Sequence, residues 1–268
     1  MKRSDFSKPL HYDFANLLEE ANNHKGDKNT SLIYRDFVTL ASCTMRQASH
    51  KLLNGVLDDT VEAEYMRTIK KYPKPDKMAY ALAVLVNGLE ETCYDFLGSV
   101  YMEMNMGNKN SAQFFTPRAL SDICAKMTFQ FTKESFAAKY PAYGISRPRF
   151  TVNDPCIGGG SMLISIVQCL REVDAHPRQW WFEAIDVDPM CAQMAFIQLS
   201  LLGAPGVVYV GNTLGQNAGQ DNPPWFTTTG ALFPLTDGQR EANAKPEMEI
   251  EIVAPKRKGF KLPNRKKP

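Results

Sequence analysis

The second half of the sequence alternates between short β-prone runs and helical runs, and this alternation limits the fold more than any other feature. The β-prone runs cover residues 149–153, 181–186 and 207–210, and helical patterns fill the intervals at 161–173 and 189–202. Strands that alternate with helices at this spacing form βαβ units, in which neighbouring strands are parallel. The sequence therefore predicts an α/β fold with a mainly parallel sheet.

The residues before this alternation predict helices. Apolar side chains recur at helical spacing in residues 32–49, and residues 62–72 form a shorter, charged helical run that Pro73 and Pro75 end. A longer helical segment is expected to begin at Asp76, with this residue as its N-cap, and to run through Val100. We therefore expect a helical N-terminal region over residues 1–110.

The rest of the chain is expected to form an α/β domain over residues 111–253 and a basic tail over residues 254–268. A further helix is predicted at 119–131, and two more β-prone runs follow the third strand, at 231–235 and 248–253. The tail carries seven basic residues and no acidic one. This composition is typical of a disordered segment, which either contacts nucleic-acid phosphates or is simply a solvated end.

The composition narrows the class of protein. A formal net charge of +2 carries little information about partners. The longest apolar run, residues 79–86, is too short to cross a bilayer, and residues 1–14 lack the apolar core of a signal peptide. The six cysteines form no C-x-x-C pair, and no histidine lies at metal-ligand spacing from them. We expect a cytoplasmic protein with reduced cysteines, no membrane contact and no metal site.

A glycine-rich turn joins the first predicted strand to its helix. It runs from Asp154 and Pro155 to three successive glycines that include Gly158 and Gly160. In an open α/β sheet, ligands bind at the carboxyl ends of the strands, and glycines there allow positive φ and close approach of a ligand. The helix N-terminus behind the turn suits a carboxylate, and Asp154 suits an ammonium group. The alternative is a turn that only connects two elements.

Polar residues follow the other two predicted strands. Asp186 ends the second strand, where a carboxylate accepts hydrogen bonds from both hydroxyl groups of a ribose. The alternative is an N-cap for the helix that begins at Pro189, although Asp188 fills that position better. Asn212 follows the third strand, where its amide suits the edge of an adenine ring, and the alternative is an ordinary turn residue.

Four short motifs occur in one order along the chain: Gln-Phe-Phe-Thr-Pro-Arg at 113–118, Asp-Pro-x-x-Gly-x-Gly at 154–160, Asp-x-x-Pro at 186–189 and Gly-Asn-Thr-Leu at 211–214. In this order and at this spacing they resemble the modification subunit of type I restriction–modification systems, a family of N6-adenine DNA methyltransferases. The stretch Asp-Phe-Leu-Gly at 95–98 is similar to the family's helix that leads into the first motif.

The resemblance, over residues 80–214, implies a Rossmann-like methyltransferase domain with S-adenosylmethionine as its cofactor. The family's pattern puts Phe115 and Thr116 at the methionine end of the cofactor, and the alternative for the pair Phe114 and Phe115 is core packing. The other cofactor residues that the pattern implies are Asp154, Pro155, Gly158 and Gly160 in the turn, Asp186 at the ribose and Asn212 beside the adenine.

The catalytic motif of the resembled family is Asn-Pro-Pro followed by an aromatic residue, and Asn222, Pro223, Pro224 and Trp225 match its letters. In such a motif, the Asn side chain and a prolyl carbonyl accept hydrogen bonds from the target amine, and the ring stacks on a flipped adenine. The motif should follow a buried strand, but the segment at 215–221 is polar, with one alanine as its only apolar side chain. An ordinary turn is the alternative.

Two functions agree with these motifs. The first is a methyltransferase that transfers a methyl group from S-adenosylmethionine to adenine N6 in DNA. The second is a relative that binds cofactor and DNA without turnover, as a regulator or partner of a restriction–modification system. The expected partners are DNA and either a separate specificity subunit or a second copy of the chain. After Leu214 there is room only for an abbreviated sheet, whose edge a partner chain would cover.

Overall fold

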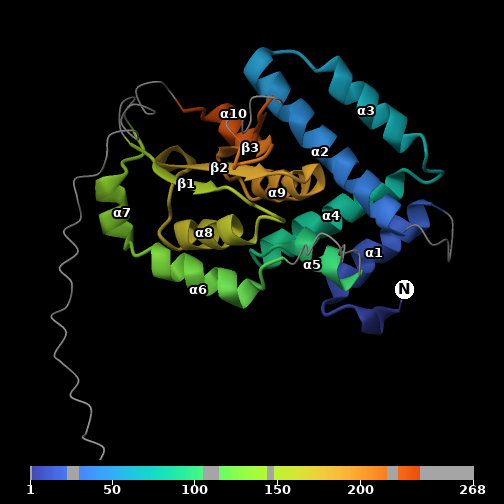
Figure 1. Ribbon diagram of the computed structural model, residues 1–268, viewed down its shortest axis with the longest axis horizontal. Coiled ribbons are helices and arrows are strands. Elements are labelled where there is room, and N and C mark those ends of the chain that lie inside the picture. The colour runs from blue at the N-terminus through green and yellow to red at the C-terminus, as the bar shows by residue number, and fades with distance from the viewer. Residues whose placement is uncertain (1, 23–29, 105–114, 144–147, 216–222, 236–268) are drawn as a thin grey trace, which may run out of the picture.

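The three predicted strands lie side by side in chain order in a four-stranded sheet, β1-β2-β3-β4 (Figure 1). The structure is a computed structural model that describes residues 2–22, 30–104, 115–143, 148–215 and 223–235. The strands are β1 (Phe150–Asp154), β2 (Trp180–Asp186), β3 (Gly206–Val210) and β4 (Trp225–Phe226). The first three are parallel, whereas β4 runs antiparallel along the outer side of β3. The prediction of a mainly parallel sheet is confirmed.

Two crossover helices connect the parallel strands and cover the sheet. They are α8 (Ser161–Glu172) between β1 and β2, and α9 (Pro189–Leu201) between β2 and β3. Apolar side chains of β2 and β3 pack in the same buried cluster as those of both helices. Asp188 caps α9, because its Oδ1 accepts a hydrogen bond from Met190 N at 2.9 Å. The predicted role of Asp188 as the N-cap therefore matches the structure.

The N-terminal region is helical, and it shares its core with the sheet. The buried apolar cluster is continuous from the first helix to β3, so the two regions do not have separate cores. The long second helix packs against α9 and β4 (Figure 1). The helices of this region are α1 (Pro9–Ala21), α2 (Thr30–Asn54), α3 (Asp59–Ile69), α4 (Asp76–Glu91) and α5 (Phe96–Glu103).

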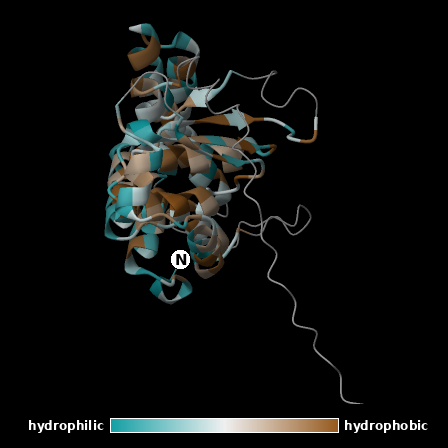
Figure 2. Ribbon diagram, turned by 90° about the vertical axis from the view of Figure 1, so that its left-hand side faces the viewer, coloured by the Kyte–Doolittle hydropathy of each residue, from teal (hydrophilic) through white to brown (hydrophobic). Residues whose placement is uncertain are grey.

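Three further helices and two 3-10 turns complete the described residues. The helices are α6 (Arg118–Thr128), α7 (Lys133–Lys139) and α10 (Thr228–Leu232), and the turns are η1 (Arg3–Asp5) and η2 (Pro177–Gln179). Helix α6 packs against α8 (Figure 1). Figure 2 shows hydrophobic segments concentrated in the middle of the molecule. None of the helices in the described ranges is long and apolar enough to cross a membrane.

The segment predicted as one long helix from Asp76 is two helices. Thr92 is extended, with φ −154° and ψ 119°, and it ends α4. Asp95 then starts α5 as its N-cap, with Oδ1 accepting a hydrogen bond from Gly98 N at 2.7 Å. Asp76 is the first helical residue of α4 and not its N-cap, since Pro75 occupies that position. The apolar spacing continues across the break, so periodicity alone did not reveal it.

The β-prone run at 231–235 is not a strand, and this prediction was wrong. Residues 228–232 form α10, whose N-cap is Thr227. A short apolar run fits a helix as well as a strand, and the buried cap decided the outcome here. The short strand β4 was not predicted. The run at 248–253 and the basic tail lie outside the described residues.

Thr227→Val tests the cap that joins α10 to the sheet. The buried Thr227 Oγ1 accepts hydrogen bonds from Gly206 N and Gly230 N and donates one to Ala204 O at 2.6 Å. Valine keeps the shape and leaves these buried groups unpaired, so the free energy of unfolding should fall by about 3 kcal/mol in urea titrations. Thr128→Val, at an exposed helix end, should change it by less than about 0.5 kcal/mol. Equal losses of stability in the two variants would contradict the capping role of Thr227.

Candidate functional site

The glycine turn lies at the carboxyl end of β1 and is held to the end of β2 by two hydrogen bonds. Ile157 N donates to Ile185 O at 3.0 Å, and Gly158 N donates to Asp186 Oδ2 at 2.8 Å. Gly158 has φ +55°, and Gly160, the N-cap of α8, has φ +101°. Residues with a side chain rarely adopt such φ values, so the turn requires glycine at both positions.

Phe115 lies directly against this turn. A Cβ atom added to Gly158 would lie 3.2 Å from Phe115 Cδ1. The ring also contacts Tyr101 of α5, at a centroid distance of 5.5 Å and in an edge-to-face arrangement. The next residue, Thr116, accepts a hydrogen bond through its carbonyl from Ser161 Oγ at 3.2 Å. The structure thus brings Phe115 and Thr116 to the glycine turn, whereas Phe114 lies outside the described residues.

Asp154 begins the turn with a partly buried carboxyl group. Its Oδ1 accepts a hydrogen bond from Cys156 N at 3.1 Å, and the following Pro155 is exposed. Burial raises the pKa of Asp154, the bond from Cys156 opposes this rise, and repulsion from Asp186 adds to it. The charge on Asp154 is therefore unfavourable in the folded chain, and a bound cation would relieve it.

Asp186 fastens the turn and the start of α9 through one carboxylate. Besides Gly158 N, the carboxylate accepts a hydrogen bond from Asp188 N at 2.9 Å through Oδ1. Its backbone carbonyl accepts one from Gly211 N at 2.9 Å, which links β2 to the loop after β3. Because Asp188 caps α9, Asp186 does not serve as the helix cap. A carboxylate has about four acceptor positions, so Asp186 retains capacity for ligand hydroxyl groups.

Asn212 lies in the loop that follows β3, beside the glycine turn. Its side chain is exposed, and its Oδ1 accepts a hydrogen bond from Leu214 N at 3.0 Å, as in an Asx turn. The neighbouring Thr213 Oγ1 donates to Pro155 O at 2.6 Å and holds this loop against the turn. The structure therefore brings Asn212 near the turn and also supports the turn-residue alternative for its side chain.

A cavity of about 320 Å³ opens beside Phe115 and the start of α8. Its walls come from α5, from the Phe-Thr-Pro-Arg segment and from the first residue of α8. The lining is mixed in charge, with two carboxyl groups and one guanidinium group, which suits a zwitterionic ligand end. The lining residues are Asp95, Gly98, Ser99, Met102, Glu103, Phe115, Thr116, Pro117, Arg118 and Ser161.

Trp225, one of the residues predicted as catalytic, lies at the opposite edge of the sheet from β1. Trp225 is in β4 and pairs with Val208 of β3, so β2 and β3 separate it from β1. Its half-buried ring packs against Phe196, at a centroid distance of 5.8 Å, and beneath the guanidinium of Arg46, at 5.2 Å. The structure does not bring Trp225 to the glycine turn. Asn222 lies outside the described residues.

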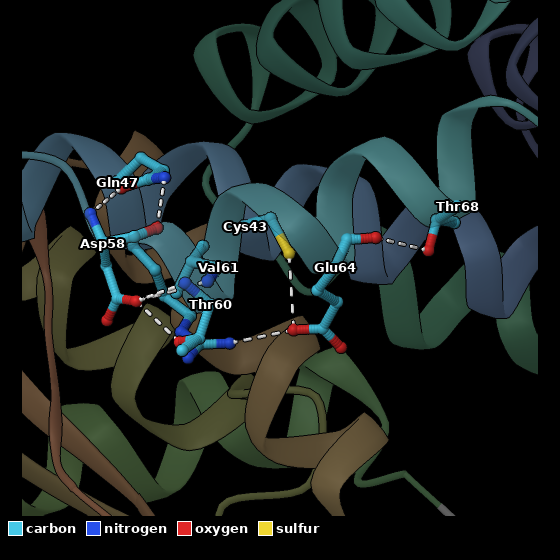
Figure 3. Close-up of polar contacts among 8 residues, drawn as sticks. Cys43, Gln47, Asp58, Thr60, Val61, Glu64 and Thr68 are labelled. Atoms are coloured by element: carbon cyan, nitrogen blue, oxygen red, sulfur yellow. Dashed lines mark hydrogen bonds and ion pairs between the residues drawn. The ribbon is translucent and has the colours of Figure 1, made fainter.

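Pro223 and Pro224 line a second, smaller cavity of about 100 Å³, together with residues of α2 and α3. Polar contacts fix these two helices where they meet, as Figure 3 shows. Gln47 exchanges two hydrogen bonds of 2.9 Å with the backbone of Asp58. The Asp58 carboxylate then caps α3 through Thr60 N. The predicted Pro-Pro segment is thus part of the helix–sheet junction and does not face the glycine turn.

Sequence reasoning missed two buried polar residues that touch the turn, Asp95 and Gln198. Gln198 lies in α9 with no exposed surface, and its amide donates to Gly159 O at 2.7 Å. The signal for Asp95 was its position directly before Phe-Leu-Gly, where it caps α5. Gln198 had a weaker signal, as one of three polar residues in a mostly apolar helix. Among the described residues, no cluster of His, Cys, Asp or Glu is suited to hold a metal ion.

The parallel strands, the crossover helices and the glycine turn after β1 define a Rossmann-like α/β fold. Residues 92–235 match the family model described as N-6 DNA Methylase, and the chain belongs to this family. The predicted resemblance to N6-adenine DNA methyltransferases is confirmed. No curated protein matches the chain.

Two solved structures show the extent of the likeness. The first, from Listeria monocytogenes, is described as a class I S-adenosylmethionine-dependent methyltransferase; it is 12% identical, with a TM-score of 0.41 over 77% of this chain and 55% of that one. The second, the methyltransferase subunit of a type I restriction–modification system from Streptococcus thermophilus, is 13% identical, with a TM-score of 0.37 over 78% and 58%. The chain spans little more than half the length of either.

Asp154→Asn should stabilise the protein at neutral pH. A carboxyl group whose pKa is higher in the folded protein binds its proton more tightly there, so stability is lost as the pH rises through the unfolded and then the folded pKa. Asparagine keeps an acceptor for Cys156 N and carries no charge. Urea titrations should show the variant more stable than the parent at pH 7, with the advantage gone below about pH 3.9. A less stable variant at pH 7 would mean that the bond to Cys156 needs the charge.

Proposed function

We propose that this chain binds S-adenosylmethionine at the glycine turn and transfers the methyl group to adenine N6 in DNA. The observation that supports the site best is the contact of Phe115 with Gly158, whose N–H donates a hydrogen bond to Asp186. An aromatic ring, a backbone without side chains and a carboxylate thereby meet at the carboxyl ends of β1 and β2. This is the position at which open α/β sheets bind nucleotides.

The residues around the turn fit the cofactor in chemistry. Gly158 is partly exposed and has no side chain, and the N-terminus of α8, which begins after Gly160, suits the cofactor's carboxylate. Asp154 suits the ammonium group, because its carboxyl group is partly buried and forms no ion pair with the described residues. Asp186 and Asn212 would hold the ribose and the adenine, and Phe115 and Thr116 the methionine end. When bound, the cofactor supplies an electrophilic methyl group.

DNA is the substrate that family membership favours. In the type I systems that the motifs resemble, a separate specificity subunit reads the DNA sequence, so we propose such a subunit as a partner, with a second copy of the chain as the alternative. The basic residues of the tail would contact phosphates without reading sequence. The proposed location is the cytoplasm, where cellular DNA and the cofactor are both present.

A second candidate function is cofactor and DNA binding without methyl transfer. The observation that favours it is the position of Trp225, which packs against Phe196 and Arg46 at the far edge of the sheet. A ring held there is not available to stack on a flipped base next to the glycine turn. Such a protein would act as a regulator or partner of a restriction–modification system.

Gly158→Ala tests the cofactor site. Alanine at φ +55° is strained, and its methyl group would press on Phe115 and fill space that the cofactor needs. Calorimetric titration with S-adenosylhomocysteine should show a loss of affinity of about tenfold or more. Gly55→Ala is the matched control, since Gly55 has φ +75° and open space around it. It should bind like the parent, and equal losses in both variants would refute the site.

Asn222→Ala separates the two candidate functions. The protein is incubated with DNA and cofactor labelled in the methyl group, with and without a type I specificity subunit, and the label on adenine is measured. An enzyme that uses Asn222 should lose transfer by at least about 100-fold while it still binds the cofactor. Asn54→Ala, at an exposed helix end, should keep full activity. Cofactor binding without transfer in the parent would support the second function.

A further inference from the structure

A buried pair, Asp95 and Gln198, connects the start of α5 to the glycine turn. Asp95 is 6% exposed and Gln198 is fully buried. Gln198 Nε2 donates to Asp95 Oδ1 at 2.9 Å and to Gly159 O at 2.7 Å. Gln198 Oε1 accepts a hydrogen bond from Leu97 N at 3.0 Å. The amide therefore uses both ends at once, and one of its three partners is the central glycine of the turn.

The second oxygen of Asp95 fits between two glycines. A Cβ atom on either Gly98 or Gly159 would overlap with Asp95 Oδ2. These two glycines come from different elements, and Asp95 Oδ1 also binds Gly98 N at 2.7 Å. The carboxylate thus fills the space that side chains at either position would need. Gly159 has no positive φ, so close approach to Asp95 and not backbone conformation explains why it lacks a side chain.

Helix α5 contacts the candidate site at two places. Asp95, its N-cap, accepts a hydrogen bond from Gln198 of α9, which also donates to Gly159 O. Tyr101 of α5 packs on Phe115. The glycines of the turn have no side chains with which to anchor themselves, so neighbouring groups must fix their backbone. Gly159 lies between the two positive-φ glycines, and its carbonyl group belongs to the peptide that joins it to Gly160.

We propose that Asp95 and Gln198 are positioning residues that fix the glycine turn in the conformation that receives the amino-acid end of the cofactor. The proposal rests on the proposed cofactor site. Because burial opposes the charge on Asp95 and raises its pKa, the carboxylate depends on the hydrogen bonds from Gln198 and Gly98. Loss of Gln198 frees the Gly159 carbonyl, whereas Asp186 and Asn212, at the nucleoside end, are unchanged.

The test compares Gln198→Met with Tyr34→Phe. Both remove buried hydrogen bonds near the start of α5, but Tyr34 donates to Leu97 O at 2.7 Å and does not bond to the turn. Calorimetric titrations use S-adenosylhomocysteine and adenosine, which differ by the amino-acid end. Gln198→Met should weaken the binding of S-adenosylhomocysteine about tenfold more than the binding of adenosine. Tyr34→Phe should change the affinity for both ligands by the same factor, as a general loss of core stability would.

Asp95→Asn is the conservative variant. Its side-chain oxygen still accepts the hydrogen bonds from Gly98 N and Gln198, so S-adenosylhomocysteine should bind within about threefold of the parent. A loss as large as that in Gln198→Met would overturn the proposed hydrogen-bonding role. Equal losses of the two ligands in Gln198→Met would also overturn it.

Hydrogen exchange keeps the inference separate from the proposed function. In the ligand-free protein, the amides of residues 157–161 should exchange about tenfold faster in Gln198→Met than in the parent, and at the parent's rate in Tyr34→Phe. Unchanged exchange in Gln198→Met would overturn the positioning role whether or not a cofactor binds. If the parent binds neither ligand but the exchange rises as expected, the proposed cofactor is wrong and the support of the turn stands.

Discussion

The hydrogen bond from Gly158 N to the Asp186 carboxylate joins the two features on which the candidate site depends. It links the carboxyl ends of β1 and β2. These ends lie close together because the two parallel strands are in register from the pair Phe150 and Trp180 onwards. A carboxylate that accepts backbone N–H groups at its oxygens fixes the turn strongly, because hydrogen bonds to a charged acceptor are stronger than neutral ones. The end of β2 thus holds the turn from outside, in addition to the bond from Cys156 N to Asp154 within the turn.

The helical N-terminal region is part of the site as well as of the core. Its last helix, α5, contributes Asp95 at one end and Tyr101 towards the other, and these contact the glycine turn and Phe115. The region also packs on α9 and β4, so one continuous apolar cluster stabilises sheet and helices together. Removing the region would expose the apolar surface of α9 and leave the turn without its support.

The far edge of the sheet has a different role. The chain returns beside β3 as β4, and Thr227 then caps α10 with a buried hydroxyl. This arrangement uses Trp225 for packing against α9 and for contact with Arg46 of α2. Pro223, Pro224 and Trp225, which match three letters of the catalytic motif, therefore lie in a structural junction. Cofactor binding and catalysis are separate questions in this protein, because these three residues lie in or next to β4 and the glycine turn follows β1, at opposite edges of the described sheet.

The sequence by itself determined the three parallel strands with their two crossover helices, the glycine turn and the Asp188 cap, because hydrophobic periodicity and local turn chemistry act over a few residues. It also carried the motifs that identify the family. Only the tertiary structure decided which distant residues meet: Asp95 and Gln198 are 103 positions apart in the chain, and their bond is invisible to any local pattern. The place of Trp225 was likewise decided by strand pairing, since a two-residue strand is too short to leave a periodic signal.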